Sequence, residues 1–157
     1  MNMNNKSEIT VVLNVFKRLH NLKKQIDAIN SQTIKSTKIL IWKNKSEQDL
    51  PPEIFSKAQV SQNNYNYGVW ARFAFALNAK TKYICVFDDD TIPGKKWFEN
   101  CLTTMDNCEG LLGTRGLKFK SRYRYSPNEG FGWDNPSNEI KRVDIVGHSW
   151  FFKREWL

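Results

Sequence analysis

The sequence predicts an α/β fold, a three-layer α/β/α sandwich with a mostly parallel central sheet. Two observations lead to this prediction. Short runs rich in β-branched residues alternate along the 157-residue chain with segments whose apolar residues recur every three or four positions. Polar side chains, including three consecutive aspartates, follow several of the predicted strands. In such sheets ligands bind beyond the carboxyl ends of the strands, so we expect these polar ends to converge on one site.

The first half of the chain begins with two predicted strands separated by a helix. Apolar and β-branched runs indicate the strands, and apolar residues spaced three and four apart indicate the helix. A proline pair then favours the start of a short helix. In order, the elements are a strand at 9–15, a helix at 19–32, a strand at 38–42, a short helix at 50–58 and a short strand at 58–63.

The second half alternates in the same way and then becomes polar. A turn rich in Asn and Gly precedes a helix whose apolar face is predicted to be Trp70, Phe73, Ala74 and Leu77. The segment at 121–139 is rich in Gly, Pro and Asn, so we expect a long loop that binds a ligand or covers a site. In order, the elements are a helix within 63–80, a strand at 83–87, a helix at 94–105, a strand at 110–116, the loop at 121–139 and a strand within 140–153.

The net charge of +8 favours anionic partners, namely nucleic acid, membrane phosphate or a phosphorylated substrate. The basic residues are spread along the chain in mild clusters, one of them at 115–124, without one basic arm or helix, so nucleic acid is not the expected partner. No apolar run is long enough to span a bilayer, and the first residues lack an apolar signal core. We therefore expect no membrane span in this chain and a cytoplasmic location.

The cysteines and histidines do not indicate a zinc site. Cys85, Cys101 and Cys108 form no CxxC pair. Two of them fall on predicted apolar faces, so we expect buried free thiols in a reducing compartment. His20 and His148 are too few and too far apart in the sequence for a zinc motif.

Asp88, Asp89 and Asp90 directly follow the most apolar predicted strand. Since side chains alternate along a strand, Asp88 and Asp90 should point one way and Asp89 the other. Two carboxylates on one side of a strand end can hold Mg²⁺ or Mn²⁺, and such a cation can stabilise charge on a diphosphate leaving group. The alternative is a solvated acidic turn, in which Asp90 or Thr91 caps the helix that follows.

Four stretches, taken in order, resemble the nucleotide-sugar-dependent glycosyltransferases of the GT-A fold. They are TVVLNVFKR, KILIWKN, NYNYGVWARFAFALNAKTKYICVFDDDTIPGKKWFENCL and VDIVGHSWFFKREWL. The third is similar to the large family 2 group, which has an Asn-x-Gly turn, an Ala-Arg pair on a helix and an aspartate triplet or DxD at a strand end. The first two also resemble the exostosin-like transferases. No single motif is specific, but their order and spacing cover nearly the whole chain.

The resemblance implies a glycosyltransferase that moves a sugar from a nucleotide diphosphate donor, by default a UDP-sugar, to a glycan or other hydroxyl acceptor. It implies Mn²⁺ or Mg²⁺ as cofactor, bound by Asp88 and Asp90. Simpler interpretations stay open: Arg72 as a surface residue of a helix, and Asn66 and Gly68 as turn residues that tolerate a left-handed backbone. The residues implied to bind the nucleotide are Asn14, Phe16, Arg18, Asn44, Asn66, Gly68, Arg72 and Asp88.

The resemblance also implies an acceptor side. Arg115 and the adjacent Gly116 would lie near the acceptor. Trp133 and Trp150 are candidates to stack on a sugar ring, because an indole offers a large apolar face.

The end of the chain departs from the family pattern. Family members usually carry a second acidic motif, often Glu-Asp, after a stretch like SWFFKREWL, and its aspartate takes the proton from the acceptor hydroxyl in inverting enzymes. That motif would fall beyond Leu157, so we expect a truncated domain without its catalytic base. Within the chain, Asp144 and His148 are less suitable substitutes, and Glu155 is a remote one.

We interpret residues 1–157 as one domain, with the nucleotide-binding half at 8–95 and the start of an acceptor half at 96–157. Such a domain would be incomplete. An incomplete core leaves apolar surface exposed, which favours association into a homo-oligomer.

Two other functions fit parts of the sequence. The segment KFKSRYRY interleaves Lys and Arg with Tyr, a pattern typical of single-stranded nucleic-acid binding, although the acidic triplet would repel phosphate without a metal. A nucleotidyltransferase shares a similar scaffold and metal site but normally has a glycine-rich basic loop after its first strand. NVFKRLHN contains no glycine, so this second function is not expected.

Overall fold

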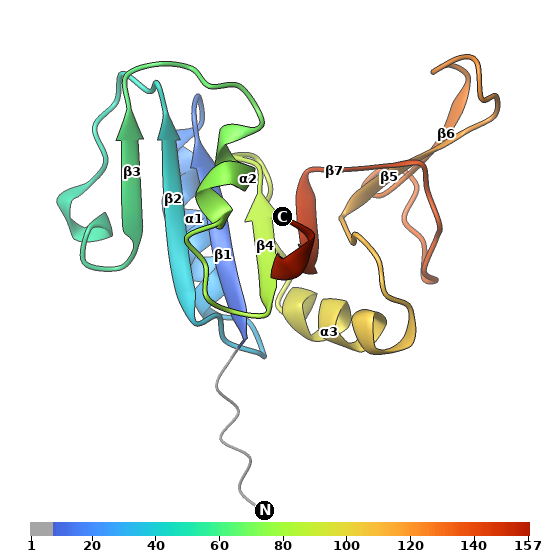
Figure 1. Cartoon of the computed structure of the whole chain (residues 1–157), viewed down its shortest axis with the longest axis horizontal. Coiled ribbons are helices and arrows are strands. Elements are labelled where there is room, and N and C mark those ends of the chain that lie inside the picture. The colour runs from blue at the N-terminus through green and yellow to red at the C-terminus, as the bar shows by residue number, and fades with distance from the viewer. Residues whose placement is uncertain (1–7) are drawn as a thin grey trace, which may run out of the picture.

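A five-stranded sheet forms the centre of the computed structural model, which describes residues 8–157 (Figure 1). Its strand order is β3-β2-β1-β4-β8, and a smaller sheet in the order β6-β5-β7 lies beside it. The strands are β1 Ile9–Val15, β2 Lys38–Asn44, β3 Gln59–Asn63, β4 Tyr83–Phe87, β5 Arg115–Phe119, β6 Asn128–Phe131, β7 Ile145–Gly147 and β8 Ser149–Lys153. The helices are α1 Leu22–Asn30, α2 Ala71–Ala76 and α3 Trp97–Asn107, with 3-10 turns at Leu19–Asn21, Pro52–Ile54 and Arg154–Trp156.

The prediction of a mostly parallel sheet is confirmed. β1 pairs in parallel with β2 and with β4, and β2 pairs in parallel with β3. Of the five described strands, β8 runs antiparallel, along β4. Parallel strands place their carboxyl ends at one edge, so the segments that follow β1, β2, β3 and β4 all start from the same edge of the sheet.

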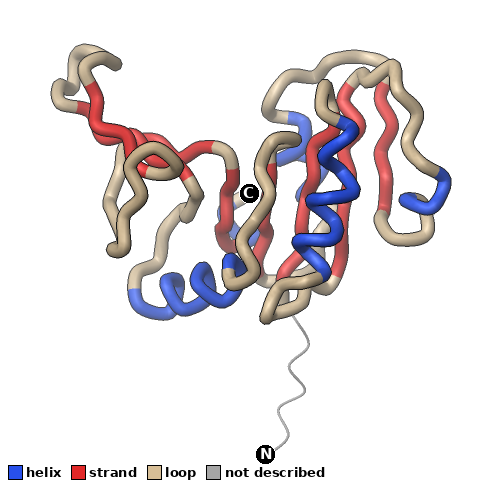
Figure 2. Tube along the Cα trace, turned by 180° about the vertical axis from the view of Figure 1, so that it is seen from behind, coloured by secondary structure: helices blue, strands red, loops and turns tan. Residues whose placement is uncertain are grey.

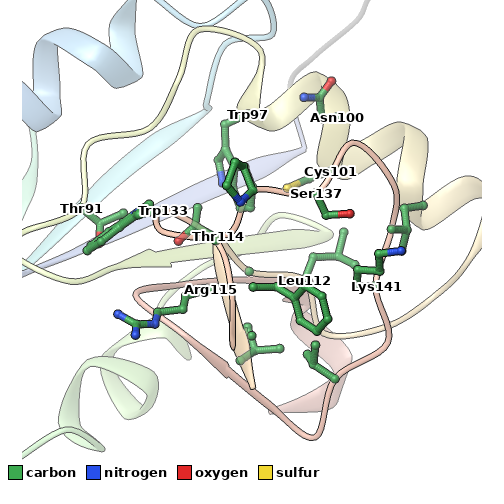
Figure 3. Close-up of a pocket in the computed structure, with 18 of the residues that line it drawn as sticks. Thr91, Trp97, Asn100, Cys101, Leu112, Thr114, Arg115, Trp133, Ser137 and Lys141 are labelled. Carbon is green, nitrogen blue, oxygen red and sulfur yellow. The ribbon is translucent and has the colours of Figure 1, made fainter. Parts of the chain in front are cut away.

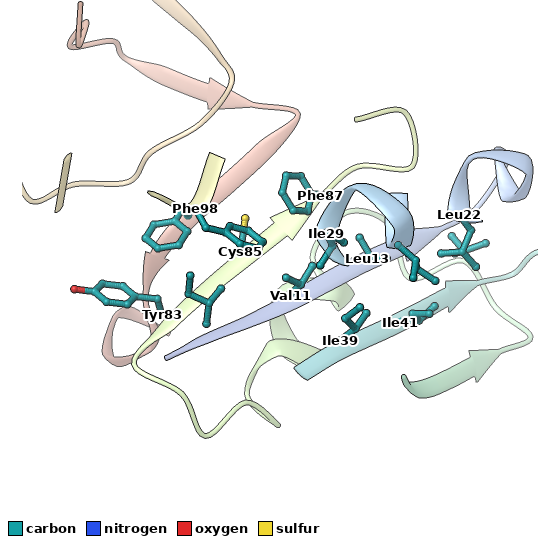
Figure 4. Close-up of a cluster of buried hydrophobic side chains, with 14 of the residues drawn as sticks. Val11, Leu13, Leu22, Ile29, Ile39, Ile41, Tyr83, Cys85, Phe87 and Phe98 are labelled. Carbon is teal, nitrogen blue, oxygen red and sulfur yellow. The ribbon is translucent and has the colours of Figure 1, made fainter. Parts of the chain in front are cut away.

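Helices cover both faces of the sheet, as expected for a three-layer sandwich. On one face, Val11 and Leu13 of β1 pack in a common core with Ile29 of α1 (Figure 4), and Figure 2 shows α1 lying across this face. On the other face, Val12 packs with Ala76 at the end of α2. Because successive side chains of a strand point to opposite faces, β1, which is buried at every position, contributes to both cores.

The start of α3 extends the first of these cores. Phe98, Cys101 and Met105 of α3 are buried there, and Trp97 and Leu102 pack against them, in keeping with the three- and four-residue spacing of apolar residues in this helix. Cys85 and Cys101 are buried free thiols, as predicted, and Cys108 is half-buried. Among residues 8–157, no helix is both long enough and apolar enough to cross a membrane.

The apolar face predicted for the helix after the Asn-Gly turn is wrong except at Phe73, which packs against the core on this side of the sheet. α2 has six residues and buries Arg72 and Ala76, whereas Trp70 is 77% exposed and Leu77 is 54% exposed. The helix is turned so that Arg72 meets Asp88 at the end of β4. The spacing of apolar residues carries no information about this ion pair. The spacing therefore predicted that the face with Trp70 and Leu77 is buried.

Three predictions for the second half also need correction. The strand expected at 110–116 begins only at Arg115, and the loop expected at 121–139 contains β6, which pairs with β5 as a hairpin. The strand expected within 140–153 is two short strands, β7 and β8. They are separated by His148, whose φ of 66° is left-handed. β7 belongs to the small sheet and β8 to the large one, so His148 lies where the two sheets join.

Candidate metal and donor site

Three side chains with metal-ligating atoms meet at the carboxyl end of β4. Asp88 and Asp90 follow this strand, and His148 comes from the junction of β7 and β8. One ligand atom from each of the three lies within 4.8 Å of the other two. We call these three residues the metal cluster.

His148 is held in the metal cluster by its backbone and by a ring contact. Its carbonyl accepts a hydrogen bond from the Asp88 N–H at 3.1 Å, and its ring centroid lies 4.5 Å from that of Trp133. Its left-handed backbone is uncommon for a residue other than glycine. Its Nδ1 atom is buried, lies 3.7 Å from Asp90 Oδ1 and has no hydrogen-bond partner among the described residues. Buried polar atoms rarely lack a partner, so this nitrogen is available to a cation.

Asp89 points away from the metal cluster, as the alternation of strand side chains predicts. It is 7% exposed, and its Oδ2 accepts hydrogen bonds from the backbone N–H groups of Lys17 and Arg18 at 3.0 and 3.2 Å. Arg18 Nη1 donates to Asp89 Oδ1 at 2.8 Å and lies 3.4 Å from Asp90 Oδ2. Asp89 therefore links the segment after β1 to the segment after β4 through hydrogen bonds and an ion pair.

The backbone that carries the aspartates is supported from the α1 side. Gln25 is 1% exposed, and its Nε2 donates to the carbonyl oxygens of Asp88 at 2.7 Å and Thr91 at 2.8 Å. Asn21 Nδ2 donates to the Asp89 carbonyl at 3.0 Å. These bonds satisfy carbonyl groups of an irregular segment and fix the direction of its side chains.

Asp88 is influenced in opposite directions by burial and by Arg72. Burial is the larger influence and holds the pKa of Asp88 above its ordinary value, although the positive charge of Arg72 lowers it. Arg72 Nη1 pairs with Asp88 Oδ1, and the guanidinium carbon lies 5.0 Å from the Trp150 ring centroid. Since Arg72 is 6% exposed, the interpretation as a surface residue is wrong.

The Asn-Gly turn is held by the end of β2. Asn44 is buried, its Nδ2 donates to Asn66 Oδ1 at 2.8 Å, and its Oδ1 accepts from the Tyr67 N–H at 2.9 Å. Asn66 Oδ1 also accepts from the Gly68 N–H at 2.9 Å. Gly68 has a φ of 68°, which glycine adopts without strain. The three predicted residues thus come together, with the side-chain amides of Asn44 and Asn66 engaged in forming the turn.

The end of β1 supplies the other predicted donor-side residues. Asn14 is buried within the strand, and Phe16 is half-buried just beyond it. Lys17 Nζ lies 5.5 Å from the centroid of the Phe16 ring. Arg18 follows at the same edge and contacts the aspartates, as described above.

A cleft of about 760 Å³ opens beside the metal cluster (Figure 3). Asp90 lines it, together with two residues predicted for the acceptor side, Arg115 and Trp133. Figure 3 shows Trp133 on the same side as Thr91, with Lys141 across the cleft.

Trp150 and Asp144 lie outside this cleft. The Trp150 ring packs edge-on against Phe73 with centroids 5.4 Å apart, and its Nε1 donates to the Val146 carbonyl at 3.0 Å. Asp144 Oδ2 accepts from the Phe119 N–H at 2.7 Å in the small sheet.

Two features of the site differ from what the sequence favours: His148, which by sequence is better explained as an ordinary loop histidine than as a metal neighbour, lies beside the aspartates, and Asp89 holds the segment after β1. The register of the sheet explains the first. Phe87 pairs with Ser149 across the antiparallel strands β4 and β8, so the residues just beyond this pair, Asp88 and His148, must be neighbours. This signal is readable only once β8 is known to pair with β4.

The metal cluster offers two carboxylates and one imidazole nitrogen. Carboxylate oxygens suit Mg²⁺ and Mn²⁺, and imidazole suits transition metals. The residues present therefore fit a divalent cation that accepts both oxygen and nitrogen ligands.

The chain matches the family model described as glycosyl transferase family 2 over residues 10–157. No significant match was found among curated proteins.

Among solved structures, TarS 1–349 of S. aureus superimposes with a TM-score of 0.56 at 15% identity, covering 73% of this chain and 37% of that chain. The complex of TarS 1–349 with UDP-GlcNAc gives a TM-score of 0.53 at 17% identity, with coverages of 76% and 36%. The mannosyltransferase PcManGT of Pyrobaculum calidifontis, solved with GDP-Man and Mn²⁺, gives 0.54 at 13% identity, with coverages of 73% and 36%. At these identities the likeness shows the fold, which is that of GT-A proteins. This chain spans little more than a third of the length of each.

Proposed function

Because this chain belongs to glycosyl transferase family 2, we propose that it transfers a sugar from a nucleoside diphosphate donor to a hydroxyl group of an acceptor glycan. The observation that carries this proposal is the metal cluster, in which Asp88, Asp90 and His148 converge where the sheet presents its strand ends. A solvated acidic turn would not require a buried, unpartnered imidazole nitrogen directed at its carboxylates.

In this reaction the acceptor oxygen forms a bond to the anomeric carbon of the donor. The bond between that carbon and the diphosphate oxygen breaks, and its electron pair leaves with the nucleoside diphosphate. The proton of the acceptor hydroxyl passes to a base. A divalent cation held by Asp88, Asp90 and His148 would neutralise the charge that develops on the departing diphosphate.

Around this cation, the chain supplies groups that orient the donor. The Arg18 side chain is 48% exposed and is held at the cluster by Asp89, so it is available to pair with a phosphate oxygen. Arg72 of α2 fixes the direction of the Asp88 carboxylate through their ion pair. The turn at Asn66 and Gly68, together with Asn14, Phe16 and Asn44, forms the side on which we place the nucleoside.

The nature of the donor and of the cation is also part of the proposal. UDP is the proposed nucleotide, with support from the TarS structures solved with UDP and with UDP-GlcNAc. PcManGT was solved with GDP-Man and Mn²⁺, so GDP has to be compared directly. The nitrogen ligand of the metal cluster favours Mn²⁺ over Mg²⁺, since Mg²⁺ prefers oxygen ligands.

Neither candidate base within the chain suits that role. His148 would be bound to the cation, and Asp144 accepts a backbone hydrogen bond outside the cleft.

Calorimetric titration with UDP and with GDP, each with and without Mn²⁺, tests the donor site without requiring turnover. We expect UDP to bind, and Asp88→Asn combined with Asp90→Asn to weaken the binding that depends on Mn²⁺ by about tenfold or more. Asp106→Asn is the matched control, because it removes an exposed carboxylate from α3. If neither nucleotide binds, or if the double variant binds like the control, the proposal is wrong.

A further inference from the structure

A strongly basic segment leads away from the cleft along β5. We use the name basic hairpin for residues 115–125, which are β5 and the first part of the turn that leads to β6. They contain five basic residues and no acidic one. Four of the five basic side chains are exposed, and that of Arg115 is half-buried. The basic residues are Arg115, Lys118, Lys120, Arg122 and Arg124.

The charges of the basic hairpin are not neutralised within the fold. In the part of the chain that the structure describes, none of its five basic residues forms an ion pair, whereas Arg18, Arg72 and Lys141 all do. Glu129 lies opposite Lys118 across the β5–β6 pair but forms no ion pair with it. A cluster of unpaired cations raises the local concentration of anionic ligands.

The basic hairpin is continuous with the cleft beside the metal cluster. Arg115 and Gly116 at the start of β5 line the cleft together with Asp90. From there β5 runs outward to the β5–β6 turn, which projects away from the large sheet (Figure 1). Since a strand rises about 3.3 Å per residue, Lys118 lies about 10 Å beyond Arg115. Lys118 lies on the same face of β5 as Gly116, which lines the cleft, so a chain-like ligand with one end in the cleft and running along this face would meet the Lys118 side chain.

Aromatic rings accompany the cations. Tyr123 is 87% exposed and Tyr125 is 61% exposed, and the Tyr125 ring packs against Phe119 with centroids 5.5 Å apart. Exposed aromatic faces suit the apolar faces of sugar rings, and Arg pairs with carboxylate or phosphate through two parallel hydrogen bonds. The combination fits a ligand that carries both sugar rings and negative charges.

We propose that the basic hairpin binds an acceptor glycan that carries carboxylate or phosphate groups. The inference rests on the proposed function, because the metal cluster defines where the acceptor hydroxyl must lie. A glycan is favoured over a single-stranded nucleic acid or an anionic membrane because the hairpin continues into the cleft in which that hydroxyl reacts. The positive charges of the basic hairpin would then select an anionic acceptor, because they contact sugars other than the one that carries the reacting hydroxyl.

Fluorescence polarisation with labelled oligomers of equal length tests this proposal. The anionic probe is an oligogalacturonate, with one carboxylate per sugar, and its neutral counterpart is a galactose oligomer. Labelled oligothymidylate and vesicles of phosphatidylserine in phosphatidylcholine are run in parallel. We expect the oligogalacturonate to bind at least about tenfold tighter than the neutral oligomer, and binding to weaken as salt is added.

Charge reversal locates the binding. Arg122→Glu combined with Arg124→Glu should weaken oligogalacturonate binding about tenfold, because each reversal replaces an attraction with a repulsion. Lys24→Glu combined with Lys57→Glu is the control, because it changes the net charge by the same amount at exposed, unpaired positions elsewhere. It should change the affinity for oligogalacturonate by less than about twofold. Arg122→Gln combined with Arg124→Gln removes the two charges without reversing them. Its loss of oligogalacturonate affinity should lie between those of the control and of the charge-reversal variant.

UDP titration with Mn²⁺ is performed on each variant and separates this inference from the proposed function. Unchanged UDP binding shows that the variant is folded and its donor site intact. Equal binding of neutral and anionic oligomers, no binding of the anionic one, or equal losses in the hairpin and control variants would overturn the inference. Tighter binding of oligothymidylate or of the vesicles would also overturn it. Failure of UDP to bind the parent chain would instead contradict the donor site.

Discussion

Replacing Asp89 tests whether this residue stabilises the fold, in contrast to Asp88 and Asp90, which we propose bind the metal. Asp89→Ala removes the acceptor of two backbone N–H groups, those of Lys17 and Arg18, in a site that is 7% exposed. A hydrogen bond to a charged group contributes about 1.5–3 kcal/mol, and Ala would leave both donors partly buried without that acceptor. The ion pair with the half-exposed Arg18 side chain adds less than about 1 kcal/mol.

We therefore expect Asp89→Ala to lower the free energy of unfolding by about 3 kcal/mol. For a domain of this size, each kcal/mol lowers Tm by about 2–4 °C, which gives a decrease of about 6–12 °C. Thermal unfolding followed by circular dichroism measures this directly. Asp90→Ala is the comparison, since the Asp90 carboxylate is 32% exposed and its nearest cation, on Arg18, is 3.4 Å away. It should cost less than about 1 kcal/mol in stability and should weaken Mn²⁺-dependent UDP binding.

Two results would contradict the structural role of Asp89. A Tm for Asp89→Ala within about 2 °C of the parent would show that the segment after β1 does not depend on Asp89. A stable Asp89→Ala variant that has lost Mn²⁺ binding, alongside an Asp90→Ala variant that keeps it, would exchange the roles of the two residues.

Three further predictions follow from single contacts. Arg72→Met should lower the free energy of unfolding in urea by about 2 kcal/mol, because it leaves the half-buried Asp88 carboxylate without its cation; an unchanged midpoint would contradict the ion pair. Gly113→Ala should cost about 1–3 kcal/mol, since its new Cβ would lie 2.5 Å from a backbone oxygen, whereas Gly110→Ala, in open space, should have no such cost. In an assay with a disulfide thiol reagent at pH 8, we expect Cys108 alone to react in the native protein and all three cysteines to react in denaturant. The other two thiols are buried, and burial raises their pKa, so their reactive thiolate stays scarce until the pH is far higher.

The sequence contains enough information to predict the parallel sheet and the strand-end site, because both depend on local patterns. The predicted bounds of the first strand, 9–15, match β1, since a fully buried strand is a continuous β-branched run. Asp88 and Asp90 point the same way, as a two-residue period predicts, although both lie beyond β4 in a segment whose carbonyl groups are held by Gln25 and Asn21. Asn44, Asn66 and Gly68 come together because their segments begin at one edge of the sheet.

What could not be predicted depends on contacts between distant segments. α2 buries Arg72 in place of Trp70 because a cation is needed beside Asp88, and this outweighs the preference for burying the larger apolar ring. His148 reaches the metal cluster only because β8 pairs antiparallel with β4, and a short strand carries no signal for its partner. The β5–β6 hairpin was taken for a loop because β6, four residues long, contains Gly and Asn, which are uncommon in strands.

The most direct test of the metal cluster is anomalous diffraction from crystals of this chain grown with Mn²⁺ and UDP. We expect one strong manganese peak within coordination distance of the Asp88 and Asp90 carboxylates and of a His148 ring nitrogen, with diphosphate oxygens completing the shell. A peak at another place, or bound UDP with no manganese between these three side chains, would contradict it.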